Sequence, residues 1–145
     1  MAITQAIANA FKKQLLEGDQ NFSSGGDVFK LALYTSSATL NSATTSFTTT
    51  NEVANSGTYA SGGGDLTGQN TSIASGVAIV DFADLSFTGV TLTARGALIY
   101  NTSSAVTNAA VAALDFGADK TATSGTFTIV FPAFTTAAAI LRISG

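Results

Sequence analysis

The 145-residue sequence contains no cysteine and no histidine. Without cysteine the chain has neither a disulfide framework nor a thiolate metal site. Without histidine it lacks the commonest general base, and serine and cysteine nucleophiles lose their usual activating partner. These absences favour a non-enzymatic protein, for which we predict no catalytic residues, no cofactor and no metal site.

Charge and long apolar runs are also scarce. Charged residues make up 10% of the chain, the net charge is −3, and Lys12 and Lys13 form its one basic pair. A nucleic-acid partner is not expected, because nothing resembles a phosphate-binding stripe. No stretch approaches the roughly 20 apolar residues of a membrane span, and the N-terminus lacks the pattern of a secretory signal. We therefore expect no membrane partner and synthesis in the cytoplasm.

Serine, threonine, asparagine and glycine supply the neutral polar surface, a mixture typical of half-buried strands joined by turns. The chain is predicted to be mainly β: a single domain, residues 1–145, forming a β-sandwich or jelly-roll-like barrel. One amphipathic helix is predicted in residues 1–18, from an N-cap at Thr4 to a stop at Gly18. Strands are predicted at 28–34, 77–82, 85–87, 90–100, 110–116, 126–131 and 137–144. The expected core contains Phe29, Leu31, Leu33, Ile79, Phe82, Leu98, Phe116, Ile129 and Phe131.

Residues 35–70 are predicted to be a long Ser/Thr/Gly-rich connection that is exposed and ordered in part by a partner. The glycines at 62–64 do not form a phosphate loop, since no GK[ST] follows them. Exposed loops and an amphipathic helix are common contact elements. The candidate contact residues are Phe11, Leu15, Phe47, Tyr59 and Leu66.

Three charged residues lie within apolar strand patterns: Asp81, Arg95 and Asp115. A charge in a strand is usually solvent-facing or paired across neighbouring strands. Arg95 with Asp81 or Asp115 is therefore the predicted structural ion pair. A hydrolase using two of the carboxylates, which include Asp84, is an alternative that lacks a spacing signature. A calcium site built from Asp65, Asp81, Asp84, Asp115 or Asp119 lacks the expected motif.

Several short strings resemble a family of small proteins encoded in the structural modules of tailed bacteriophages. They are LYTSSATL (33–40), TTNEV (49–53), GTY (57–59), VDFAD (80–84), ARGALIYN (94–101), LDFG (114–117) and FTIVFP (127–132). The resemblance spans about residues 31–132 and supplies no catalytic residues. It implies a virion accessory protein similar to capsid decoration or cement proteins.

On this resemblance we expect a virion protein, made in the host bacterial cytoplasm, that stabilises the capsid shell by bridging its subunits. Its partners would be the major capsid protein or another virion protein, and copies of itself in a homo-oligomer such as a trimer. Two alternatives remain open. One is a tail or fibre component. The other is a carbohydrate-binding module that uses Tyr34, Tyr59 and Tyr100 as aromatic platforms.

Overall fold

A computed structural model describes residues 2–145, which form eight strands and one short helix. The predicted mainly β fold is confirmed, with two antiparallel sheets in a sandwich-like arrangement. The elements are β1 (Ala6–Ile7), α1 (Asn9–Glu17), β2 (Phe29–Tyr34), β3 (Gly64–Asp65), β4 (Asn70–Ala74), β5 (Val77–Asp81), β6 (Leu85–Asn101), β7 (Ala109–Ile129) and β8 (Leu141–Ile143).

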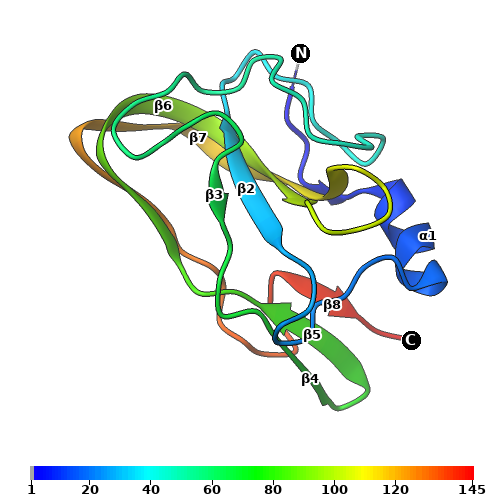
Figure 1. Ribbon diagram of the computed structural model, residues 1–145. Helices are drawn as coiled ribbons and strands as arrows, with labels where there is room; N and C mark the ends of the chain where they lie inside the picture. Colours follow the sequence, from blue (N-terminus) through cyan, green and yellow to red (C-terminus); the bar gives the residue numbers. More distant parts are fainter. Residues whose placement is uncertain (1) are drawn as a thin grey trace.

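The larger sheet has the strand order β1-β7-β6-β2-β3 and the smaller sheet the order β4-β5-β8. Figure 1 shows the small sheet below the large one, with α1 beside them and β6 and β7 extending to the opposite side as a long curved ribbon. Strand β6 pairs with both β2 and β7. It is therefore the central strand of the fold.

Both faces of β2 are covered, which explains why its burial does not alternate. Directly opposed residues of an antiparallel pair share a face, so Leu31 lies with Ile99 on one face and Ala32 with Leu98 on the other. On the first face Phe29 stacks on Phe22, with ring centroids 4.3 Å apart. The second face is covered by the chain that follows β2. An apolar run of this kind is typical of a strand buried on both sides.

Two long strands, β6 and β7, replace four of the predicted short ones. The breaks implied between predicted strands 85–87 and 90–100, and between 110–116 and 126–131, are absent, because the chain continues through both as strand. Gly89 and Gly117 have φ of 61° and 81°, and the β6–β7 register shifts at four places. Glycine allows such local kinks without ending a strand. The same residues that usually mark turns therefore bend a continuous hairpin here.

The helix begins at Asn9 and not near Thr4, so the first part of the helix prediction is wrong. Ala6 and Ile7 instead form β1 against β7, and the Thr4 N–H donates to the Leu40 carbonyl. Sheet pairing supplies these backbone groups with partners that an isolated helical turn would otherwise provide. The predicted end at Gly18 is confirmed, with φ of 80° in the left-handed region.

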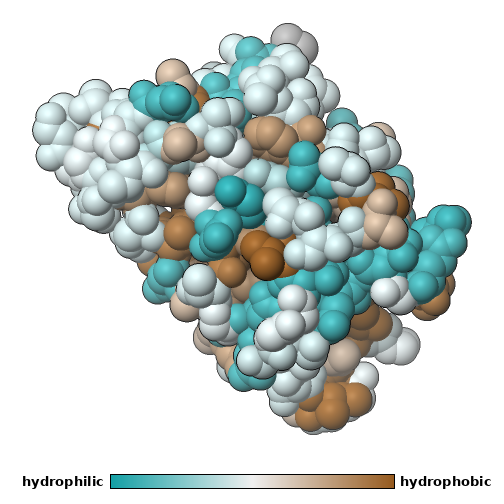
Figure 2. Space-filling model, viewed as in Figure 1, coloured by the Kyte–Doolittle hydropathy of each residue, from teal (hydrophilic) through white to brown (hydrophobic). Residues whose placement is uncertain are grey.

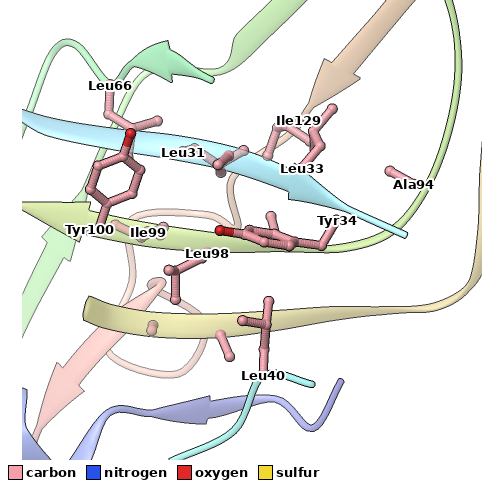
Figure 3. Packing of buried hydrophobic residues seen from close by; sticks show 14 of the residues in the cluster. Leu31, Leu33, Tyr34, Leu40, Leu66, Ala94, Leu98, Ile99, Tyr100 and Ile129 are labelled. Carbon is pink, nitrogen blue, oxygen red and sulfur yellow. The ribbon is translucent and has the colours of Figure 1, made fainter. Parts of the chain in front are cut away.

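The core joins the large sheet, the small sheet, the helix and the chain between β2 and β4. Figure 3 shows Leu31, Leu33, Leu98 and Ile99 of the large sheet in one cluster with Leu40 and Leu66 of that intervening chain. Eight of the nine predicted core residues are buried, and Phe116 is half-buried. Strands β3 and β4 were not predicted, and the last strand is shorter than predicted.

Candidate contact surface

The long connection, defined here as residues 35–69 between β2 and β4, runs along the β2 edge of the large sheet and covers part of its second face, where Phe47 stacks on Tyr100. Leu40, Val53, Tyr59 and Leu66 from this segment are each at most 5% exposed. Strand β3 lies within it and pairs with β2. The chain therefore orders this connection itself, through apolar side chains that point into its own core.

Three tyrosine hydroxyls fix the connection to the sheet. Tyr34 donates to the Thr48 carbonyl at 2.6 Å and Tyr100 to the Gly62 carbonyl at 2.6 Å. Tyr59, which belongs to the connection, accepts a hydrogen bond from the Leu33 N–H at 2.8 Å. The rings are 3% exposed or less. They consequently present no open aromatic face on which a sugar could stack.

Burial raises the pKa of all three tyrosines. Desolvation, which disfavours the charged phenolate, is the main cause in each case. It raises the pKa of Tyr100 to about 12 and that of Tyr34 and Tyr59 further. The carboxylate of Glu52 acts in the same direction on all three. These hydroxyls therefore stay protonated donors over the ordinary pH range.

Glu52 gathers the glycine-rich part of the connection around its carboxylate. One oxygen, Oε1, accepts hydrogen bonds from the Tyr59 hydroxyl at 2.9 Å and from the Gly62 N–H at 2.6 Å. The other, Oε2, accepts one from the Ser61 hydroxyl at 2.8 Å. Hydrogen bonds to an ionised acceptor are stronger than neutral ones. Glu52 thus holds in place a stretch whose glycines would favour disorder.

The outward side of the long connection is formed by small, neutral side chains. Glu52 and Asp65 are its two charged residues: Glu52 is engaged inward, and the exposed Asp65 is paired with Lys30 of β2 at 3.6 Å. Its exposed positions include Ser36, Ser37, Thr39, Ala43, Thr45, Thr48, Thr49, Thr50, Thr58 and Ser61. The upper part of Figure 2, over much of this segment, is mostly pale, which marks intermediate hydropathy. We call this exposed side of residues 35–69 the connection surface.

A second polar cluster positions the helix and the ends of β2 and β6. The amide nitrogen of Asn101, a residue that is fully buried, donates to Gln20 at 2.8 Å and to Asp27 at 2.7 Å. Gln20 in turn donates to Gln14 of α1 at 2.8 Å. The predicted strand 90–100 ends one residue before Asn101, and the expected core did not include this residue. Its position directly after the apolar run at residues 97–100 is the sequence feature that could have predicted its burial.

The structure places the five candidate contact residues largely inside the molecule. Phe11 is 3% exposed, Tyr59 1% and Leu66 4%, so these three have no free surface for a partner. Leu15 and Phe47 are half-buried against the core, and the Phe47 ring stacks on Tyr100 at 4.7 Å. Sequence reasoning selected apolar residues in exposed-looking segments. The surface consists of their small polar neighbours.

Arg95 and Asp115 are brought together across β6 and β7, with Nε 3.1 Å from Oδ1. The Gly117 N–H and then the Arg95 guanidinium lower the pKa of the Asp115 carboxyl. Asp81 lies in β5, outside this pair, and its Oδ1 is buried without a hydrogen-bond partner. Asp84 accepts the Phe131 N–H at 2.9 Å. Each carboxylate thus has a different environment, and Asp115 alone of the two predicted partners contacts Arg95.

Within residues 2–145, no three acidic side chains lie close enough together to hold a metal ion. The one helix described there is too short to cross a membrane. No family model, curated protein or solved structure matches the chain.

Proposed function

We propose that this chain is a non-enzymatic structural protein of a tailed-phage virion, a capsid decoration or cement protein that bridges capsid subunits. The observation that carries the proposal is the connection surface: a neutral, hydroxyl-rich surface fixed from below by three buried tyrosines and Glu52. The sequence resemblance to tailed-phage structural proteins is the reason for proposing a phage virion as the particle. The partners would be the major capsid protein or another virion protein, together with further copies of this chain.

A fixed surface suits a protein whose output is contact area. Ordering loops on binding costs free energy, and a loop that is already held in its bound shape avoids much of that cost. Tyr34 and Tyr100 anchor the connection at Thr48 and Gly62, which lie on either side of its middle. The intervening turns are therefore already in place before any partner arrives.

The low charge of the connection surface, where the exposed Asp65 is paired with Lys30, favours dense assembly. Copies of one protein around a capsomer bring identical surfaces near one another, and like charges would then repel. Serine and threonine hydroxyls can donate and accept, directly or through water, in such an interface. A cyclic homo-oligomer, for example a trimer, would let one small chain meet several neighbouring capsid subunits.

The first test is to locate the protein on its source particle by immunogold electron microscopy, using antibody raised against the purified chain. Regular label over the head is the expected result. Label confined to the tail would replace the capsid assignment with a tail or fibre role. Absence of the protein from purified particles would overturn the virion proposal itself.

A second test addresses the connection surface. Thr49 is exposed on it, and Thr135 is exposed in the segment between β7 and β8, which is not part of the long connection. Purified Thr49→Lys and Thr135→Lys proteins would be compared for binding to particles stripped of the native protein. Loss of binding in Thr49→Lys alone supports the connection surface as the contact. Equal binding of both variants would show that the particle is contacted elsewhere.

A further inference from the structure

Strands β4 and β5 form a tight hairpin that projects from the body of the molecule. Ser75 and Gly76 are the two residues between the strands, with φ of 50° and 75°. Positive φ at both central positions is the mark of the type I′ turn, whose twist matches the flanking strands. Figure 1 shows the hairpin extending below the large sheet, away from α1 and the long connection. Its shape is set by its own turn and pairing.

The outer edge of β4 is free. β4 pairs with β5 through five consecutive residue pairs and is the edge strand of the small sheet. All five of its residues are exposed, and Ile73 is 73% exposed. The tip of the hairpin is an apolar patch in Figure 2. An edge strand of this kind offers a row of unpaired backbone groups to another strand.

Natural proteins usually protect such edges with charges, bulges, proline or short length. Strands β1 and β3 are two residues long, and β8 is three residues long and contains Arg142. The free part of β7 is kinked at Gly117 and Ser124 and contains Asp119 and Lys120. β4 has none of these features. The sequence from Leu66 to Val80 contains no charge and no proline.

We infer that β4 pairs in antiparallel fashion with β4 of a second copy of this chain, about a two-fold axis at Ser72. This register places Ser72 opposite its own copy, Thr71 opposite Ile73 and Asn70 opposite Ala74. All five residues of each strand are then paired, and β-branched side chains face one another on one side. Two three-stranded sheets become one of six strands.

The charge pattern selects a second copy as the occupant. A strand from a charged partner would find no complementary charge on β4, whereas an identical neutral strand meets no like-charge repulsion. The contact is isologous, so a single undefended edge satisfies both copies. The inference goes beyond the proposed function and does not depend on which particle, if any, contains the protein.

Pairing of two five-residue strands buries less than the roughly 1,200 Å² typical of stable interfaces. The contact is therefore weak in dilute solution and accumulates where copies are concentrated. The chain has no cysteine, so single engineered thiols can trap it as a disulfide. Directly opposed strand residues have Cβ atoms about 4.5–5.5 Å apart, close to disulfide geometry.

The test uses Ser72→Cys protein at about 1 mM under mild oxidation, a concentration that populates millimolar contacts. The matched control is Ser24→Cys, exposed in the loop before β2. We expect covalent dimer from Ser72→Cys at a rate at least about tenfold above the control. Thr71→Cys and Ile73→Cys should each stay monomeric alone and cross-link when mixed.

Adding Ile73→Lys to Ser72→Cys should abolish the cross-link by placing like charges along both edges. Because the Ile73 side chain is 73% exposed, the circular dichroism and melting temperature of this double variant should match those of the single variant. A Ser72→Cys protein that cross-links no faster than Ser24→Cys would overturn the inference. So would efficient cross-linking of Thr71→Cys alone, or persistence of the Ser72→Cys dimer in the presence of Ile73→Lys.

Discussion

Glu52 illustrates how one ionised side chain can order a glycine-rich segment. Its carboxylate receives three donors, from Tyr59, Ser61 and Gly62, which lie close together in the long connection. Without that acceptor the donors would need water, and the buried Tyr59 hydroxyl has little access to it. The free energy of unfolding should therefore depend on Glu52.

The first prediction concerns this carboxylate. Glu52→Ala should lower the free energy of unfolding by about 2 kcal/mol, the range expected when hydrogen bonds to a charged group are lost. Glu17→Ala is the matched control, since Glu17 is the only other glutamate and pairs with Lys13 at the surface. Chemical denaturation gives the difference, and limited proteolysis should cut the connection faster in Glu52→Ala. Equal stability of the two variants would contradict a stabilising role for the hydrogen bonds to Glu52.

The second prediction concerns Phe131, an apolar side chain of the core. It is 8% exposed, and its ring lies 5.7 Å from that of Phe82. Phe131→Ala should cost about 3–5 kcal/mol in unfolding free energy, from lost burial and the cavity left behind. The neighbouring Val130 is 72% exposed, so Val130→Ala should be nearly neutral. A near-neutral Phe131→Ala in denaturant unfolding would remove Phe131 from the core.

At the scale of elements, periodicity predicted which residues face the core better than where the elements begin and end. Phe29, Leu31 and Leu33 are buried as predicted, although Ala32 between them is buried as well. The helix prediction started too early because apolar spacing at Ile7 and Phe11 fits a helix, whereas the backbone near Ile7 pairs with Ala112 of β7. Such pairing joins residues far apart in sequence, which local patterns do not report.

The contact surface was harder to predict for a related reason. Sequence reasoning expected the connection to be exposed and chose its apolar residues, such as Tyr59 and Leu66, as contacts. Those residues bind the connection to the sheet instead. The role of Glu52 was not predicted, because its three donors lie seven to ten residues later in the chain and no sequence motif links them to it. The composition of residues 35–69 did predict the kind of surface that this segment exposes, which consists mostly of Ser and Thr side chains.

The approach of β3 to β2 depends on Gly63. Its φ is 80°, and a Cβ there would overlap the Leu31 carbonyl oxygen of β2. Gly76, in the β4–β5 turn, has φ of 75° with no atom within 4 Å of its Cβ position. Gly76→Ala should thus cost only about 1–2 kcal/mol for the left-handed backbone. Gly63→Ala should cost clearly more, or prevent folding. Similar melting temperatures for the two variants would show that β3 can move away from β2 at little cost.

Across the whole molecule, the large sheet is the layer on which everything else is placed. The small sheet and helix cover one face, and the long connection extends the β2 edge and covers part of the other face, with the tyrosine hydroxyls linking sheet to connection. The two polar clusters, around Glu52 and around Asn101, lie on different parts of that framework. Loss of one layer would expose the apolar face beneath it, so the layers should unfold together.

The last prediction is that stability falls steeply above pH 10. An unfolded tyrosine ionises near 10.0, whereas burial keeps the pKa of Tyr34, Tyr59 and Tyr100 higher in the folded chain. Their stabilisation is therefore fully present below pH 10 and is lost as pH rises through the folded values. Each tyrosine that is ionised only in the unfolded state lowers the unfolding free energy by about 1.4 kcal/mol per pH unit.

Tyrosinate absorbance and circular dichroism, recorded together during an alkaline titration, should change in one cooperative step, because the hydroxyls ionise only when the layers separate. Tyr59→Phe should lower stability at neutral pH, because it removes the hydroxyl that accepts from the Leu33 N–H and donates to Glu52. It should also make the unfolding free energy depend less steeply on pH above pH 10. Lys13→Met controls for Lys13, whose pKa is raised by its hydrogen bond to Glu17. Gradual phenolate formation near pH 10 in protein that remains folded would mean that the three hydroxyls are open to solvent and do not hold the connection to the sheet.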